Sequence, residues 1–343
     1  MKNLIFIALF ILQCLSVYVL HRNYVSYQEQ IKIYPAINGG SFIEENEFFA
    51  NMETTLPNLS TSSIPLKAIK GYYYLANYGN DSLDLALKLL HQGIKDNPYL
   101  MYSEGTIASI YHETILKDSA EIYSRKAFKG IPKNAIHFAM IAKMYANQGK
   151  YDSIISSFEK VKSPPQLKIY TIFLASMMNF IDKVDTTVVK KHARFAKFWW
   201  PYQDENLVLL ADYHIYGKEQ VTKSIELENK AELLLKKKKY NEGLEVLKKS
   251  LSLRKNNLGL YQSIGLVYFN LGDHKKVIEV LEDVREKALN IQNIDIDPMS
   301  VYALGLSYRK NKQYAKACEM FSIGVDQKFD LAKESYLKYC AGN

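Results

Sequence analysis

The sequence is poor in the residues that mark specialised folds. It contains three cysteines, 16 glycines and nine prolines in 343 residues. Three cysteines are too few for a disulfide framework, and the low glycine and proline content excludes a collagen-like or low-complexity chain. With 48% hydrophobic and 23% charged residues, the composition is that of an ordered globular protein.

Sequence signatures of metal, redox and catalytic sites are also missing. No C-x-x-C pair, P-loop, G-x-S-x-G or G-x-G-x-x-G motif occurs, and the pair His112-Glu113 lacks the second histidine of a zinc helix. We therefore predict that the chain is not an enzyme and has no cofactor and no metal. The pairing of Cys318 with Cys340 stays open, since it requires a carboxy terminus outside the cytosol and a suitable geometry.

The net charge of +8 is concentrated in one window. Residues 230–255 contain nine basic side chains against three glutamates. The run Lys236–Lys239 lies where a helix is expected to end, and cations there complement the helix dipole. A solvated helix face explains this window without phosphate recognition, so we expect no nucleic-acid partner.

The amino terminus carries a long apolar run. Residues 4–20 are interrupted only by Gln13 and Ser16, and the run is flanked by Lys2 and Arg22. We interpret residues 1–23 as a membrane helix, an uncleaved signal-anchor rather than a cleaved signal peptide, because the run continues past Cys14 and no small-x-small site follows it. The flanking charges favour an extracytoplasmic body, periplasmic if the source is bacterial.

The body contains one pattern several times, with a small residue followed three positions later by an aromatic or apolar residue. The copy with Gly265 and Tyr268 recurs 40 residues later, and a third copy lies 34 residues earlier. Small residues allow paired helices to approach closely, and the rings fill the grooves beside them. The positions that define the repeats are Ala108, Tyr111, Ala120, Ala142, Tyr145, Gly265, Tyr268, Gly305, Tyr308 and Ala317.

These residues resemble the tetratricopeptide repeat (TPR), a helix–turn–helix unit of about 34 residues. The resemblance implies an all-α fold, a right-handed superhelical solenoid of antiparallel helix pairs, preceded here by one apolar helix. We expect the following segments: a membrane helix at 1–23, a degenerate helical unit and loop at 24–66, TPR-like repeats at 67–201, an irregular junction at 202–223, TPR repeats at 224–328, and a capping helix and tail at 329–343.

Proteins of this family generally bind peptides or helices along the surface formed by the first helix of each pair. The residues that we expect on this protein-binding surface are Gln262, Leu266, Phe269, Tyr302, Leu306 and Arg309. Their mostly apolar character favours an apolar or helical partner. The alternative is that the carboxy-terminal helix covers this surface itself.

The sequence thus predicts a membrane-anchored scaffold that binds another protein and catalyses nothing. An alternative is an accessory or tail-like component of a cell-envelope glycan polymerase or ligase of the O-antigen type, because an apolar segment followed directly by repeats loosely resembles the last span and tail of such proteins. RNA binding by the helical repeats is a third, weaker possibility, and salt-resistant retention on a polyanion resin would support it.

Overall fold

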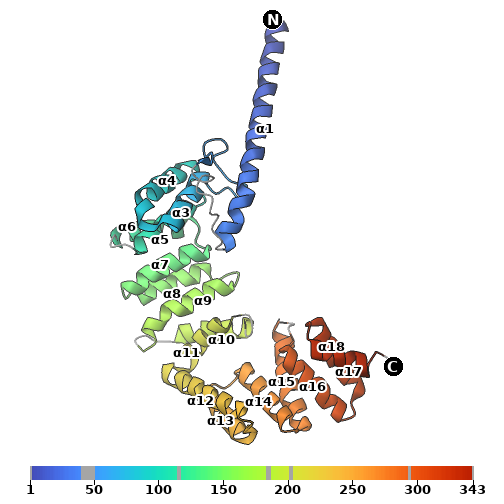
Figure 1. Ribbon diagram of the computed structural model, residues 1–343. Coiled ribbons are helices and arrows are strands. Elements are labelled where there is room, and N and C mark those ends of the chain that lie inside the picture. Colours follow the sequence, from blue (N-terminus) through green and yellow to red (C-terminus); the bar gives the residue numbers. More distant parts are fainter. Residues whose placement is uncertain are drawn as a thin grey trace. The chain divides into compact units, whose positions relative to one another are not determined.

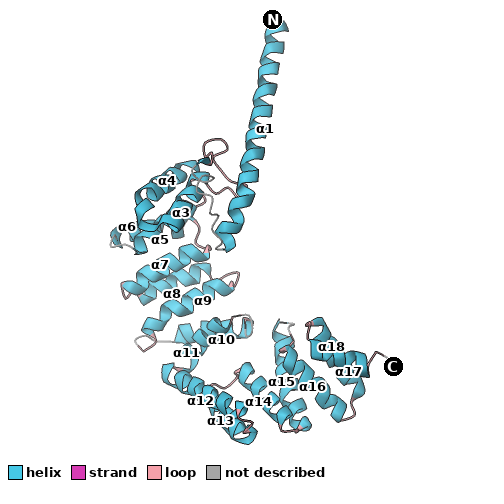
Figure 2. Ribbon diagram, in the orientation of Figure 1, coloured by secondary structure: helices cyan, strands magenta, loops and turns pink. Residues whose placement is uncertain are grey.

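The computed structural model of the chain describes residues 2–39, 51–113, 117–182, 187–200, 204–292 and 295–341. These residues are mainly helical, and they include no strand (Figure 2); Leu59 and Pro65 form an isolated β-bridge. The prediction of an all-α fold is confirmed. The chain divides into two compact units, Met1–Pro164 and Pro165–Asn343.

In its described residues, unit 1 contains the long amino-terminal helix and three successive helix pairs (Figure 1). The pairs are formed by α3 with α4, α5 with α6 and α7 with α8. The helices of this unit are α1 (Lys2–Gly39), α3 (Leu66–Tyr78), α4 (Leu83–Asp96), α5 (Tyr102–Glu113), α6 (Lys117–Gly130), α7 (Ala135–Asn147) and α8 (Tyr151–Val161), with a 3-10 turn at Gly79–Ser82.

Unit 2 continues the same pattern of packing between consecutive helices. Its helices are α9 (Leu167–Met177), α10 (Thr187–Trp199), α11 (Glu205–Tyr216), α12 (Lys218–Lys236), α13 (Tyr240–Leu253), α14 (Leu258–Asn270), α15 (His274–Gln292), α16 (Pro298–Lys310), α17 (Tyr314–Asp326) and α18 (Asp330–Tyr339), with a 3-10 turn at Met178–Phe180.

Two expected segments differ from the structure. The first helix does not end near residue 23 but continues to Gly39. The degenerate helical unit expected within 24–66 falls largely on residues 40–50, which lie outside the described part. The segment 202–223, which we expected to be irregular, contains α11 and the start of α12 from residue 204 onward. Burial of Leu207 and Ala211 accounts for this regular helix.

In several helix pairs, the turn between the two helices contains one residue in the left-handed backbone conformation. The residue in the left-handed region is Gly149 in one pair and Gly272 in another, at φ +71° and +76°. Lys238 and Lys312 occupy the same place at φ +58° and +61°. Glycine adopts this conformation without strain, whereas lysine adopts it only because the packed helices require it.

The small residues that define the repeats lie at helix crossings. Ala108, Ala142, Gly265 and Gly305 are buried. A Cβ atom at Gly305 would lie 2.7 Å from Cε1 of Phe321, a ring that is itself fully buried. The close approach of α16 and α17 therefore depends on the missing side chain.

We expect Gly305→Ala to lower the free energy of unfolding by about 1 to 3 kcal/mol, because the added methyl group forces the Phe321 ring or the helix backbone to move. Urea denaturation followed by circular dichroism measures this change. The control is Gly259→Ala in the exposed first turn of α14, where the same substitution meets only the Asn257 side chain at 3.4 Å and improves helix propensity. Equal stability of the two variants would contradict the packing argument.

Candidate functional site

The surface predicted from the sequence lies on two neighbouring helices of unit 2. Gln262, Leu266 and Phe269 lie on α14, and Tyr302, Leu306 and Arg309 lie on α16. All six are half-buried, and α14 contacts α16 directly. The four apolar residues of this set pack against the core of unit 2.

The part of this surface on α16 is covered by the carboxy-terminal segment of the chain. The Arg309 guanidinium lies 3.7 Å from the ring centroid of Tyr339, a cation–π contact, and the Tyr302 ring lies 5.8 Å from that of Phe329. A disulfide joins Cys318 on α17 to Cys340 directly after α18, with Cα atoms 5.7 Å apart. Tyr302 and Arg309 are thus in contact with the chain's own carboxy-terminal residues.

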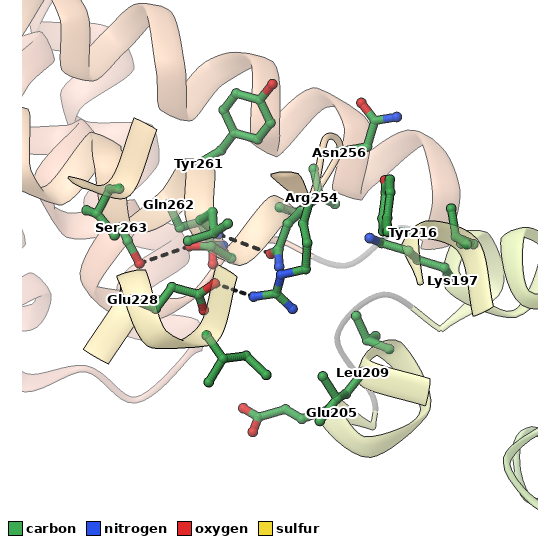
Figure 3. A pocket seen from close by; sticks show the side chains of 18 of the residues that line it. Lys197, Glu205, Leu209, Tyr216, Glu228, Arg254, Asn256, Tyr261, Gln262 and Ser263 are labelled. Carbon is green, nitrogen blue, oxygen red and sulfur yellow. Dashed lines mark hydrogen bonds and ion pairs between the residues drawn. The ribbon is translucent and has the colours of Figure 1, made fainter. Parts of the chain in front are cut away.

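A pocket of about 1000 Å³ opens further upstream in the same unit (Figure 3). It is formed by α10, α11, α12, α14, the turn between α13 and α14, and one residue each of α13 and α15. Of the six residues predicted from the sequence, only Gln262 lines it. Its apolar walls include Phe198, Val208, Leu209, Ile215, Ile225 and Leu258.

The wall of the pocket contains a network of paired charges centred on Arg254. This side chain is buried at the end of α13, where its guanidinium pairs with Asp212 on α11 at 3.2 Å and with Glu228 on α12. Lys197 on α10 also pairs with Asp212, which is fully buried. Two cations therefore meet two carboxylates, and the network carries no net formal charge.

Two serines complete the hydrogen bonding of this network. Ser224 accepts a hydrogen bond from Nε of Arg254 at 2.9 Å, and Ser250 donates to Oε1 of Glu228 at 2.8 Å. A buried charge is costly unless it is both paired and hydrogen-bonded, and here both conditions are met. The network ties α10, α11, α12 and the end of α13 together around the pocket.

Tyr216 lies next to this network. Lys197 approaches its ring at 5.5 Å, and its hydroxyl donates to the main-chain carbonyl of Lys255. Burial raises the pKa of Tyr216, and the Asp212 carboxylate raises it further. Tyr216 is therefore a neutral hydrogen-bond donor at physiological pH.

Gln262 supplies the pocket with an unsatisfied donor. Its Nε2 atom is buried and has no hydrogen-bond partner among the described residues. Ser263, Asn256 and Asn257 lie on the same lining and offer further polar atoms (Figure 3). A buried amide without a partner is destabilising unless a ligand completes it, and its natural complement is a carbonyl oxygen.

The local sequence carries only a weak signal for this site. Asp212 stands out as an acidic residue inside the apolar stretch of α11, but Arg254 lies 42 residues away and nothing local connects the two. Among the residues described, no three histidine, cysteine, aspartate or glutamate side chains are grouped where they could hold a metal ion.

Comparison with known proteins identifies the repeats. Residues 227–257 and 258–284 match the family model of the tetratricopeptide repeat. Residues 227–284 thus contain two tetratricopeptide repeats, as the spacing of small and aromatic residues predicts, and the described part of the chain is an all-α arrangement of consecutive helix pairs.

Similar solved structures include two TPR proteins. The TPR domain of P58(IPK) is 11% identical, with 92% of this chain and 97% of that chain covered and a TM-score of 0.37. A tetratricopeptide repeat protein from Parabacteroides merdae is 12% identical, with 78% and 97% covered and a TM-score of 0.37. No curated protein matches the chain.

Proposed function

We propose that this chain is a membrane-anchored scaffold that binds another protein through the pocket of unit 2 and performs no catalysis. A TPR fold supports a protein-interaction role in general. The observation that carries the proposal for this pocket is the buried, unpartnered amide of Gln262 beside apolar walls. The amide takes a main-chain carbonyl of the partner, and the walls take its apolar side chains.

The anchoring part of the proposal rests on α1. The segment Ile5–Ile31 of this helix contains a window that is long and apolar enough to cross a membrane, with a mean hydropathy of 1.9, and none of this window is buried by the protein. A soluble core helix with this composition would be covered by other helices.

The disulfide supports an extracytoplasmic position for the repeats. Disulfides persist in oxidising compartments and are rare in the cytosol. The bridge between Cys318 and Cys340 lies at the end of the chain opposite to the membrane helix. We therefore place the amino terminus inside and both repeat units outside, in the periplasm if the source is bacterial.

A photo-crosslinking residue in place of Leu209, inside the pocket, is expected to give one discrete protein adduct in the cells that produce this protein. The same residue in place of Leu233, which is exposed on α12 outside the pocket, is the matched control and gives none. Gln262→Leu removes the proposed hydrogen bond from the Gln262 amide to the partner. This variant should bind about tenfold more weakly, a loss of about 1.4 kcal/mol, and give correspondingly less adduct. Equal adducts from positions 209 and 233 would contradict the proposal.

A further inference from the structure

The part of α1 that follows the apolar run is docked into unit 1. Ser26 and Gln30 are both buried although they are polar. Gln30 donates from Nε2 to Oγ of Ser26 at 3.0 Å, and its Oε1 accepts the main-chain N–H of Thr61 at 2.9 Å. Helix α1 is therefore exposed along its apolar run and packed against unit 1 from Ser26 onward.

A second contact, an ion pair, fixes where the loop at residues 53–55 lies along α1. Arg22, directly after the apolar run, pairs with Glu53 at 3.0 Å. Glu53 also accepts hydrogen bonds from the hydroxyl and main-chain N–H of Thr55 and from the N–H of Thr54, and these bonds together with Arg22 lower its pKa to about 2. The carboxylate thus stays charged at any physiological pH and holds residues 53–55 against the helix.

The length of the apolar run places this loop at the edge of a bilayer. Residues 4–20 span about 25 Å at about 1.5 Å per residue, whereas a hydrocarbon core is about 30 Å thick. The remaining few ångströms of the bilayer thickness correspond to the next turn of α1, which contains Arg22 and Tyr24. Glu53 pairs with Arg22 at this same position along the helix. Whatever surrounds α1 at this level meets the lipid interface.

Three large apolar or aromatic side chains are exposed around this level, beside the exposed polar residues His21, Asn23 and Thr55. Tyr24 is 63% exposed and Tyr27 47%, and Leu56, three residues after Glu53, is 42% exposed. Tyrosine is typical of membrane interfaces, and an exposed leucine beside a membrane span is favourable only if lipid covers it.

We propose that residues 53–57 form a membrane-contact surface, with Leu56 inserted among the lipid headgroups of the bilayer that α1 spans. This inference rests on the membrane anchoring proposed above. Two points of contact, the span and the loop, hold unit 1 against the bilayer, and residues 22–31 connect them rigidly. The partner of this surface is the phospholipid itself.

The test uses the full chain in phosphatidylcholine vesicles. The variant Leu56→Cys, made together with Cys14→Ser, carries one thiol for an environment-sensitive fluorophore because Cys318 and Cys340 are bridged. We expect phosphatidylcholine brominated on its acyl chains near the headgroup to quench about half of the emission. Tyr18→Cys in the span serves as the positive control. Tyr99→Cys, at an 85% exposed position of unit 1, serves as the negative control.

The outcomes separate the two proposals. Quenching at positions 18 and 56 but not at 99 supports the contact surface. Quenching at position 18 alone, with position 56 behaving like position 99, overturns the contact surface and leaves the anchoring intact. No quenching at position 18, together with release of the protein by alkaline carbonate, overturns the anchoring and the contact surface with it.

Discussion

Arg254→Met is expected to lower the free energy of unfolding by about 3 to 5 kcal/mol, because it leaves Asp212 fully buried with Lys197 as its one remaining cation. Glu228 and Ser224 lose their guanidinium partner at the same time. Methionine retains much of the side-chain volume, so the loss comes from the missing guanidinium charge and not from a cavity. The midpoint of urea denaturation, with an unchanged slope, measures this effect.

The matched control removes a charge of the same sign from an exposed pair. Lys236 on α12 pairs with Glu232 four residues earlier, and both side chains are more than half exposed. Lys236→Met should therefore change the stability by less than about 1 kcal/mol. The double variant Arg254→Met with Asp212→Leu should be less destabilised than the sum of the two single variants, since it removes both members of the buried pair. A loss for Arg254→Met no larger than that for Lys236→Met would show that the network does not stabilise unit 2.

Breaking the disulfide is expected to cost about 3 kcal/mol, since Cys318 and Cys340 have a sequence separation of 22 and the bridge restricts the unfolded chain. The variant Cys318→Ser with Cys340→Ser should melt at a lower temperature than the oxidised protein. Hydrogen exchange should localise the effect to the amides of α18, because this helix packs mainly against α17. The contacts of Tyr339 with Arg309 and of Phe329 with Tyr302 should loosen together.

Reductant provides the control for this prediction. Reduction of the natural chain should lower its melting temperature to that of the double serine variant, and the variant itself should not respond. In intact cells, a membrane-impermeant maleimide should label Cys318 and Cys340 after mild reduction if the repeats lie outside the cytosol. Labelling of these two cysteines without any reductant would contradict a bridge in the cell.

The repeat residues show how far local sequence patterns reach. Gly305 and Phe321 are 16 residues apart, and their contact follows from two helices joined by a short turn. A pattern of small and aromatic residues at helical spacing therefore predicts the pairs, and the family match at residues 227–284 agrees with it. The sequence pattern does not predict that α1 continues beyond the apolar run, because its contacts there, Arg22 with Glu53 and Gln30 with Thr61, lie outside any local window.

The candidate site shows the opposite case. Gln262 lines the pocket, and its place on the first helix of a repeat is a local property that the sequence pattern predicts; its role in binding stays a prediction. The contacts of Arg309 could not be derived in the same way, since they depend on where α18 packs. The charge network joins side chains from four helices, and no spacing in the sequence connects them.

The sequence by itself determined an apolar first helix, an all-α fold and tetratricopeptide repeats, because each of these depends on residues within one or two helices of each other. Only the tertiary structure shows where the pocket of unit 2 opens, that Asp212 and Arg254 pair, and that residues 53–55 are held against α1. These features arise where helices distant in the sequence meet, and the free energy of such contacts depends on burial that no local pattern records.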